Sequence, residues 1–198
     1  MRTELVFLLS YLLGAIPFAY IFARLIGGVD IRTVGDGNVG ARNVWRSVGP
    51  LAGMATLLAD VGKGYLAILL AKHCQLSQMA VIAAGFTAVM GHDWTVFLRF
   101  QGGQGMAASV GTMLALLPRE TTLSLGVVGV VWGLLRHLDL AFSVGFGLLP
   151  LLAWRFGEPS QLVLYPVVLF PTIGLKKLID LPRARRIQER LGRGPSGR

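Results

Sequence analysis

Apolar residues occur along this chain in seven runs, separated by short polar segments. The runs cover residues 5–26, 51–71, 79–98, 106–117, 122–135, 140–154 and 162–179. A helix needs roughly 20 apolar residues to cross the hydrocarbon core of a bilayer. The run at 106–117 is short and can cross only if the glycine-rich segment before it lies at membrane depth. The pattern predicts an all-α membrane protein of about seven transmembrane helices.

Composition agrees with this prediction and limits what else the chain can contain. Of its 198 residues, 54% are apolar and 15% are charged, and the mean hydropathy is +0.62. Seven spans leave no room for a soluble domain of ordinary size. We therefore expect one transmembrane helical domain over residues 1–180 and a basic cytoplasmic tail over 181–198. The single cysteine excludes a disulfide framework, and no metal or cofactor motif occurs, so neither group is expected.

The positive charges predict the orientation of the chain. The net charge is +9, and eight basic against two acidic residues lie between Lys176 and the C-terminus. This position indicates contact with anionic membrane lipid rather than with nucleic acid. An odd number of spans puts 14 of the 19 Lys and Arg residues on one side of the membrane and four on the other. Because cytoplasmic loops carry the positive excess, we expect an extracytoplasmic N-terminus and a cytoplasmic C-terminus in the cell membrane.

Two glycine-rich segments fall on that same cytoplasmic side. In the first, glycines alternate with polar residues: Gly35, Asp36, Gly37, Asn38, Gly40, Arg42 and Asn43. Glycines allow successive amide groups to turn inward and form a nest for an anion. If a helix begins at Ala41, Arg42 and Arg46 share one face and can clamp a phosphate. A flexible connector is the alternative, and it explains neither the paired arginines nor the asparagines.

The second segment places Gly102, Gly103 and Gly105 directly before the apolar run that begins at Met106. Free amide groups at the N-terminus of a helix form a phosphate site, and the Ser109 hydroxyl could contribute to it. Glycine also occurs in membrane helices for close packing. Two anion sites on one face nevertheless indicate a transfer between two phosphorylated molecules.

Charged residues also occur inside the predicted spans. Asp60 and Lys63 lie one helical turn apart, and either charge alone would be costly in a bilayer. We expect them to neutralise each other, either as a structural pair or as the lining of a polar cavity. The neighbours His92 and Asp93 could form a base and its orienting group, but adjacent helical residues point about 100° apart. A histidine bonded to a nearby carbonyl is the alternative.

Taken together, the motifs resemble a known family. GDGNVGARNVWRSVG, after the first span, is similar to the first motif of the bacterial membrane glycerol-3-phosphate acyltransferases that use acyl phosphate, and GHDWTVFLRFQGGQGMAA is similar to the second. The spacing of Asp60 and Lys63 is also that of the family. The resemblance implies seven spans and transfer of a fatty acyl group from acyl phosphate to glycerol 3-phosphate without a metal. The product would be lysophosphatidate, for phospholipid biosynthesis.

The resemblance also implies site residues. Those expected to bind substrate are Gly37, Asn38, Gly40, Arg42, Asn43, Arg46, Gly102, Gly103, Gln104 and Gly105. Asp36 is a candidate base for the attacking hydroxyl, with His92 as a second candidate. Several positions depart from the family pattern. Its first-motif serine and threonine are Asp36 and Arg42, its second-motif lysines are Gln101 and Gln104, and its third motif has no counterpart in LPRARRIQERLGRG.

These departures leave more than one function open. Arginines can replace the missing lysines, because a guanidinium binds phosphate in a bidentate manner. Alternatively, the acceptor has changed or catalysis has been lost, leaving a lipid-binding protein. A small anion transporter is a further alternative. It is disfavoured because the first, fifth and sixth apolar runs are almost wholly apolar, whereas a pore needs polar groups at many depths.

Overall fold

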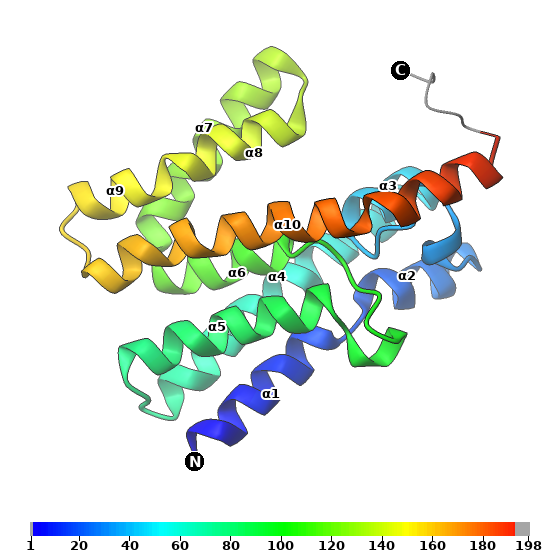
Figure 1. Cartoon of the computed structure of the whole chain (residues 1–198). Helices are drawn as coiled ribbons and strands as arrows, with labels where there is room; N and C mark the ends of the chain where they lie inside the picture. The colour runs from blue at the N-terminus through cyan, green and yellow to red at the C-terminus, as the bar shows by residue number, and fades with distance from the viewer. Residues whose placement is uncertain (1, 193–198) are drawn as a thin grey trace.

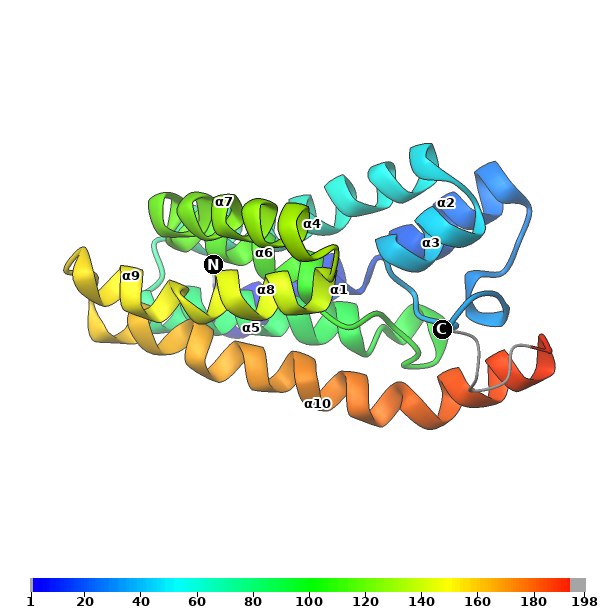
Figure 2. The same ribbon diagram turned by 90° about the horizontal axis from the view of Figure 1, so that it is seen from above.

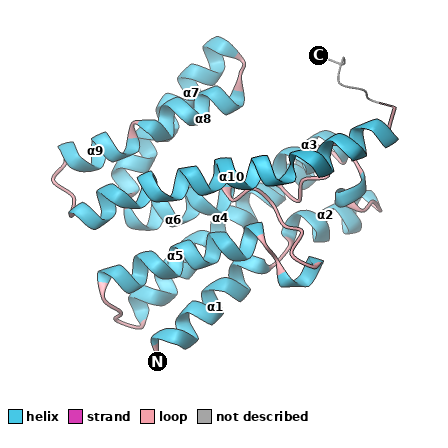
Figure 3. Ribbon diagram, viewed as in Figure 1, coloured by secondary structure: helices cyan, strands magenta, loops and turns pink. Residues whose placement is uncertain are grey.

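The computed structural model describes residues 2–192, and every regular element in that range is a helix (Figure 3). The α-helices are α1 (Thr3–Ala15), α2 (Phe18–Gly27), α3 (Ala41–Ser47), α4 (Pro50–His73), α5 (Gln78–Asp93), α6 (Met106–Leu116), α7 (Pro118–Leu135), α8 (Leu138–Gly147), α9 (Leu149–Arg155) and α10 (Ser160–Arg190). Short 3-10 turns at Ile31–Thr33 and Val96–Leu98 lie within the two glycine-rich connections. The expected all-α fold is confirmed.

Five segments are long and apolar enough to cross a membrane. They are Thr3–Gly27, Pro50–His73, Gln78–Leu98, Leu138–Arg155 and Ser160–Arg190. Helix α6 is apolar but shorter, and the polar residues that begin α7 lower the mean hydropathy of that helix. Two of the expected spans are interrupted. The first breaks between α1 and α2, and the sixth breaks between α8 and α9, where a new helix begins at Leu149 with Pro150 in its first turn.

The break at Pro17 has a consequence for packing. Proline has no amide hydrogen, so it cannot continue the hydrogen-bond ladder of α1. Carbonyl groups before the break are therefore available to other helices. The Lys63 amino group of α4 donates to the Ile16 carbonyl at 3.1 Å, and the Thr95 hydroxyl donates to the Ala15 carbonyl. The interruption thus joins three segments of the chain inside the bundle.

Glycines allow the central helices to approach each other closely. A Cβ at Gly64 of α4 would overlap the Ala108 carbonyl of α6, and one at Gly111 of α6 would overlap the Val61 carbonyl of α4. Small residues at helix crossings are typical of membrane bundles, where close packing replaces the hydrophobic effect as a source of stability. This tight centre holds α5 and α6 beside α4, and so positions the glycine-rich connection between α5 and α6.

Helix α10 runs along the whole molecule and reaches the loop between α2 and α3 (Figures 1 and 2). It has 31 residues, which at a rise of 1.5 Å per residue gives about 46 Å, more than the roughly 30 Å hydrocarbon core. The helix continues through residue 180, where the basic tail was expected to begin, as far as Arg190. Residues 193–198 of that tail lie outside the described part of the chain.

Candidate active site

Asn43 organises the first glycine-rich segment from inside. Its side-chain amide donates to the carbonyls of Ile31, Val34 and Asn38 at 3.0–3.2 Å, and its oxygen accepts from the Ser47 hydroxyl at 3.1 Å. Only 2% of the residue is exposed. These contacts use the polar atoms of Asn43 within the loop, and its expected role in substrate binding stays a prediction. The side chain fixes the loop backbone in front of α3.

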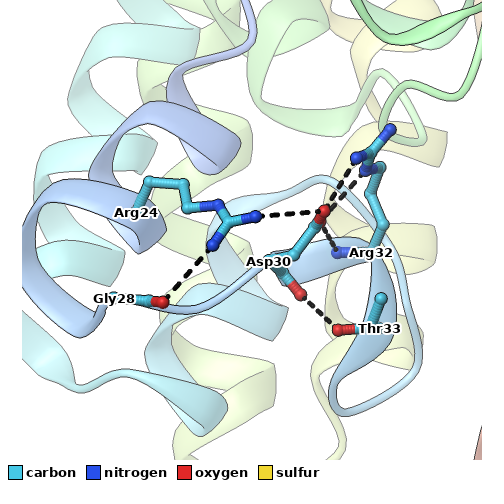
Figure 4. A network of polar contacts seen from close by, with 5 residues as sticks. All are labelled: Arg24, Gly28, Asp30, Arg32 and Thr33. Atoms are coloured by element: carbon cyan, nitrogen blue, oxygen red, sulfur yellow. Dashed lines mark hydrogen bonds and ion pairs between the residues drawn. The ribbon is translucent and has the colours of Figure 1, made fainter.

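A second set of polar contacts holds the start of this loop (Figure 4). The Asp30 carboxylate accepts two hydrogen bonds from the Arg32 guanidinium, at 3.0 and 2.7 Å, and one from the Arg32 amide. Arg24 lies 3.8 Å from the same carboxylate. The Arg32 hydrogen bonds lower the pKa of Asp30 below its ordinary value of 3.8, against the opposite effect of burial. The carboxylate is thus kept ionised as the centre of the turn.

The two arginines of α3 have different environments. The helix begins at Ala41 as expected. Arg42 forms an ion pair with Asp139 at 2.8 Å, and Asp139 also pairs with Lys177 of α10 at 3.2 Å. Arg46 pairs with no acidic side chain among the described residues, and it lines a cavity of about 290 Å³ together with Val34, Gly35, Ser47 and Leu191. Within the described residues Arg42 is thus engaged in an ion pair and Arg46 is not, and the expected clamp of two arginines stays a prediction.

The second glycine-rich segment lies directly on the end of α5. The amides of Gly102 and Gly103 donate to the carbonyls of Asp93 and His92, at 3.2 and 3.0 Å. A Cβ at Gly103 would overlap the Nε2 atom of His92 and would lie 2.8 Å from the Val39 carbonyl of the first segment. The two glycine-rich segments therefore touch each other.

The hydrogen bonds of both segments revise the predicted anion nests. The Gly37 amide donates to the Val34 carbonyl at 3.0 Å, and the Asn38 amide donates to the Asp36 carboxylate at 3.0 Å. In the second segment, Gln104 and Gly105 are the loop residues whose amides donate to no carbonyl of the described chain. They directly precede α6, so the available donors gather at the N-terminus of that helix.

A buried group of charges lies beneath these loops. The Lys63 amino nitrogen is 2.9 Å from an oxygen of Asp60, and the Nδ1 atom of His92 is 3.5 Å from the same oxygen. All three residues are at most 5% exposed. The expected neutralisation of Asp60 by Lys63 is confirmed. His92 faces Asp60 of α4 rather than Asp93 or a carbonyl group, because adjacent positions of α5 point in different directions.

Asp36 and His92, the two candidate bases, lie in different surroundings. Asp36 is half-buried on the first segment, and one of its carboxylate oxygens is used by the Asn38 amide. His92 is buried below Gly103. No hydrogen bond or ion pair within residues 2–192 joins these two side chains. Ser109, one turn into α6, is buried with its hydroxyl unpartnered in the described chain.

The end of α10 lies against the first glycine-rich segment, on the side where arginines can replace the missing lysines. Arg183 donates to the Gly37 carbonyl at 3.4 Å. The Ile187 side chain packs on Gly37 so closely that a Cβ there would overlap it. Leu191 lines the cavity of Arg46. The signal for this role was the amphipathic spacing of Ile187 and Leu191 among basic residues, which predicts a helix that covers a surface.

Comparisons with known proteins identify this arrangement. Residues 4–180 match the family model described as glycerol-3-phosphate acyltransferase. The chain belongs to this family.

Solved and curated relatives agree with this assignment. The crystal structure of PlsY, an integral membrane glycerol 3-phosphate acyltransferase in its glycerol 3-phosphate form, superposes with a TM-score of 0.82 and 29% identity over 97% of this chain and 94% of that one. Glycerol-3-phosphate acyltransferases of Geotalea daltonii and Jannaschia sp. are 35% and 40% identical to this chain. These alignments cover 93% and 92% of this chain, and 95% and 89% of the two relatives.

Membership of the family decides between the functions left open by the sequence. The chain is an integral-membrane acyltransferase that transfers an acyl group to glycerol 3-phosphate. The transporter and lipid-binding alternatives receive no support from these matches. The departures at Asp36, Gln101 and Gln104 are therefore features of a glycerol-3-phosphate acyltransferase whose site differs from the usual motif.

Proposed function

We propose that the acyl donor of this enzyme is an acyl phosphate and that its site faces the cytoplasm of the cell. The observation that carries this proposal is the contact between the two glycine-rich segments, where a Cβ on Gly103 would lie 2.8 Å from the Val39 carbonyl. Each segment offers groups suited to an anion, so two phosphates can be held side by side. An acyl phosphate and glycerol 3-phosphate each carry one phosphate.

The acceptor's phosphate is assigned to Arg46. Its guanidinium pairs with no carboxylate of the described chain, and it lines a cavity together with Leu191, the residue that follows α10. A guanidinium matches the geometry of phosphate oxygens and remains charged at any physiological pH. Gly35 forms part of the same wall, so the phosphate can approach the backbone where no side chain intervenes.

The donor's phosphate is assigned to the N-terminus of α6. The amides of Gln104 and Gly105 remain free of backbone partners within the described chain, and α6 begins at the next residue. The partial positive charge of a helix N-terminus stabilises an anion there. Because the donor's phosphate is also the leaving group, the same donors stabilise the charge that develops on it during transfer.

The reaction needs alignment more than chemical activation. A hydroxyl oxygen of glycerol 3-phosphate forms a bond to the acyl carbon, and the bond from that carbon to the phosphate oxygen breaks. The hydroxyl proton ends on the released phosphate, and the product is lysophosphatidate. An acyl phosphate is already an activated mixed anhydride, so positioning and charge stabilisation account for most of the required rate. The candidate groups to carry the proton are Asp36, whose second carboxylate oxygen has no hydrogen-bond partner in the described chain, and His92.

The proposed orientation has structural support. Arg42 of α3, Asp139 of α8 and Lys177 of α10 form one ionic link, and Arg183 contacts Gly37. The segments that the charge pattern assigns to the cytoplasm thus lie together. This grouping supports seven spans with an extracytoplasmic N-terminus and a cytoplasmic C-terminus in the plasma membrane.

The test is a transfer assay with purified protein in nanodiscs. Radiolabelled glycerol 3-phosphate is incubated with palmitoyl phosphate or with palmitoyl-coenzyme A, and labelled lysophosphatidate is measured. We expect labelled lysophosphatidate to form with palmitoyl phosphate as the donor and not with palmitoyl-coenzyme A. If it forms with palmitoyl-coenzyme A and not with palmitoyl phosphate, the proposed donor is wrong.

Arg46→Ala tests the acceptor site in the same assay. We expect the KM for glycerol 3-phosphate to rise by at least about 30-fold, because a charged hydrogen-bonding pair contributes roughly 2 kcal/mol or more. Arg185→Ala, which removes an exposed arginine of α10, is the matched control and should leave this KM unchanged. Equal kinetics for Arg46→Ala and wild type would remove Arg46 from the site.

A further inference from the structure

The turn between α5 and the second glycine-rich segment displays apolar side chains on its surface. Residues 96–100 read VFLRF, so only Arg99 among them is polar. Val96, Phe97 and Phe100 are 45%, 57% and 59% exposed. Connecting loops usually carry polar residues, because they lie in contact with water. This turn ends a segment that is long and apolar enough to cross a membrane, Gln78–Leu98, so its exposed aromatic residues lie where lipid is at hand.

The scaffold of the turn holds the two phenylalanines outward. The Thr95 hydroxyl donates to the Ala15 carbonyl at the break between α1 and α2, and the Thr95 carbonyl accepts from the Phe100 amide at 2.8 Å. Leu98 stands between the two phenylalanines, is 7% exposed, and packs in a cluster with residues of α2 and α3. Because Leu98 is turned inward, Phe97 and Phe100 remain on the outside. A hydrogen-bonded turn, rather than a loose loop, therefore presents their rings.

The backbone at the second phenylalanine has a conformation that side chains rarely adopt. The φ angle is +54° at Arg99 and +62° at Phe100. Positive φ is uncommon for residues other than glycine, and for a bulky residue it is an outlier. Such conformations cost free energy and gather at functional sites. Glycine would adopt this conformation without strain, so an aromatic residue at this position indicates a use for its side chain.

Phe100 is close in the chain to the groups assigned to the donor's phosphate. Gln104, whose amide has no backbone partner in the described chain, follows it by four positions, so their Cα atoms are at most about 14 Å apart. A palmitoyl chain is longer than this distance. An acyl donor has an anionic head and an apolar chain. Free amide groups suit the first, and exposed aromatic rings suit the second.

We propose that Phe97 and Phe100 form the surface on which the acyl chain of the donor lies between the bilayer and the reacting carbon, and that they favour long chains. The proposal rests on the assignment of the donor's phosphate to the N-terminus of α6, and it names the part of the site that binds the apolar half of the donor. Each methylene group that the rings remove from water contributes about fourfold to affinity. A shorter chain offers fewer methylene groups to the two rings.

Aromatic residues at a bilayer surface can also anchor a protein without touching its substrate. Loss of an anchor acts on the whole enzyme, so it changes the turnover of long and short donors by the same factor. Loss of an acyl-chain surface acts only through the donor, and it penalises the long chain more. The ratio of activities with two chain lengths therefore separates the two roles.

The test measures kcat/KM in nanodiscs with palmitoyl phosphate and with octanoyl phosphate. We expect Phe100→Ala to lower the palmitoyl-to-octanoyl ratio at least about fivefold, and Phe97→Ala to lower it in the same direction. The KM for glycerol 3-phosphate should change less than about twofold, because its site is separate. Phe100→Leu, which keeps an apolar side chain, should hold the ratio within about twofold of wild type. Partitioning of each donor into the lipid is the same for every variant and cancels in the comparison.

The matched control is Trp154→Ala. Trp154 is an exposed aromatic residue of α9, at the opposite end of the molecule from the turn (Figures 1 and 2). Its substitution removes aromatic surface outside the donor site, so the ratio should equal that of wild type. A ratio that is unchanged in both Phe97→Ala and Phe100→Ala would overturn the proposal, even if overall activity falls. If Phe100→Ala does not fold, Phe97→Ala decides by the same criterion.

The wild-type enzyme separates this proposal from that of the donor. If wild type is active with palmitoyl phosphate and the variants keep its ratio, only the acyl-chain surface is wrong. If wild type uses palmitoyl-coenzyme A and not palmitoyl phosphate, the proposed donor is wrong. The ratio is then measured with the coenzyme A thioesters of the same two acids, where an unchanged ratio overturns the acyl-chain surface as well.

Discussion

Asn43 and Arg46 lie one turn apart on α3, but the side chain of one is bonded within the loop and the side chain of the other lines a cavity. Asn43 uses its side chain inside the loop, where it bonds three backbone carbonyls. Arg46 turns toward the cavity and pairs with no carboxylate of the described chain. Both residues match the same sequence motif. A sequence motif therefore contains residues that stabilise a loop as well as residues that are available to a ligand, and only the structure shows which residues belong to each group.

Gly103 is expected to tolerate no side chain. A Cβ there overlaps the His92 ring and approaches the Val39 carbonyl to 2.8 Å, so Gly103→Ala must push the two glycine-rich segments apart. We expect loss of at least about 90% of kcat/KM, equivalent to about 1.4 kcal/mol, in the transfer assay.

The control for this prediction is Gly126→Ala in α7, where a Cβ meets no atom within 4 Å. Alanine has the higher helix propensity, so this variant should keep full activity and gain up to about 1 kcal/mol in stability. Full activity of Gly103→Ala would show that the contact between the segments is dispensable.

Asp30 predicts a pH dependence of stability. The Arg32 hydrogen bonds depress the pKa of Asp30 in the folded protein below its ordinary value of 3.8. Its contribution to stability is therefore complete above the unfolded-state pKa and is lost as the pH falls through the lower, folded-state pKa. Thermal unfolding should show wild type more stable than Asp30→Asn at about pH 7, with the difference shrinking below about pH 4. A difference that is independent of pH would contradict this account.

The sequence allowed most residue types of the site to be predicted, but few of their partners. The glycines, Arg46 and the Asp60 and Lys63 pair follow from local spacing, because helical geometry relates positions three or four apart. The partner of Arg42 is Asp139, 97 residues away, and Arg183 contacts the Gly37 carbonyl, 146 residues away. Such pairings depend on how helices pack, and a single sequence carries no local pattern for that.

At the scale of elements, the interruption between α1 and α2 contributes hydrogen bonds that hold the bundle together. A continuous helix would use the Ala15 and Ile16 carbonyls for its own ladder. At the break the Ala15 carbonyl accepts from Thr95, and the Ile16 carbonyl accepts from Lys63 and from the Phe18 amide. The apolar run from residue 5 to 26 predicted a crossing, and it contains Pro17. The hydrogen-bond donors to the carbonyls at the break could not be predicted from this run, because they come from α4 and from the turn after α5.

Two proline substitutions test the role of this break. Replacing proline within a helix usually stabilises it, by up to about 3 kcal/mol. Pro17→Ala should instead lower the melting temperature, because a repaired helix takes the carbonyls away from Lys63 and Thr95. Pro171→Ala, at an exposed position where α10 remains helical, should leave the melting temperature unchanged or raise it. A rise for both variants would show that the released carbonyls contribute no stability.

For the whole molecule, the orientation in the membrane can be tested with the natural cysteine. Cys74 is the single cysteine of the chain and lies in the turn between α4 and α5. With an extracytoplasmic N-terminus, a membrane-impermeant maleimide should label Cys74 in intact cells.

The matched variant for this measurement carries Cys74→Ser and Gln188→Cys. Gln188 is exposed near the end of α10, so labelling should appear only after the cells are permeabilised. Labelling of Gln188→Cys in intact cells, and of Cys74 only after permeabilisation, would show that the N-terminus is cytoplasmic and that the proposed orientation is wrong.

The position of Leu191 in the chain bears on how the enzyme is made. Leu191 lines the cavity of Arg46, and it follows α10, the last helix of the described chain. Ribosomes synthesise the N-terminal part first, so α3 and its arginine enter the membrane long before the wall that completes their cavity. The proposed acceptor site of a nascent chain is therefore incomplete until α10 has been made. A premature stop codon within the last turns of α10 should release a protein with its other helices in place and a weaker affinity for glycerol 3-phosphate.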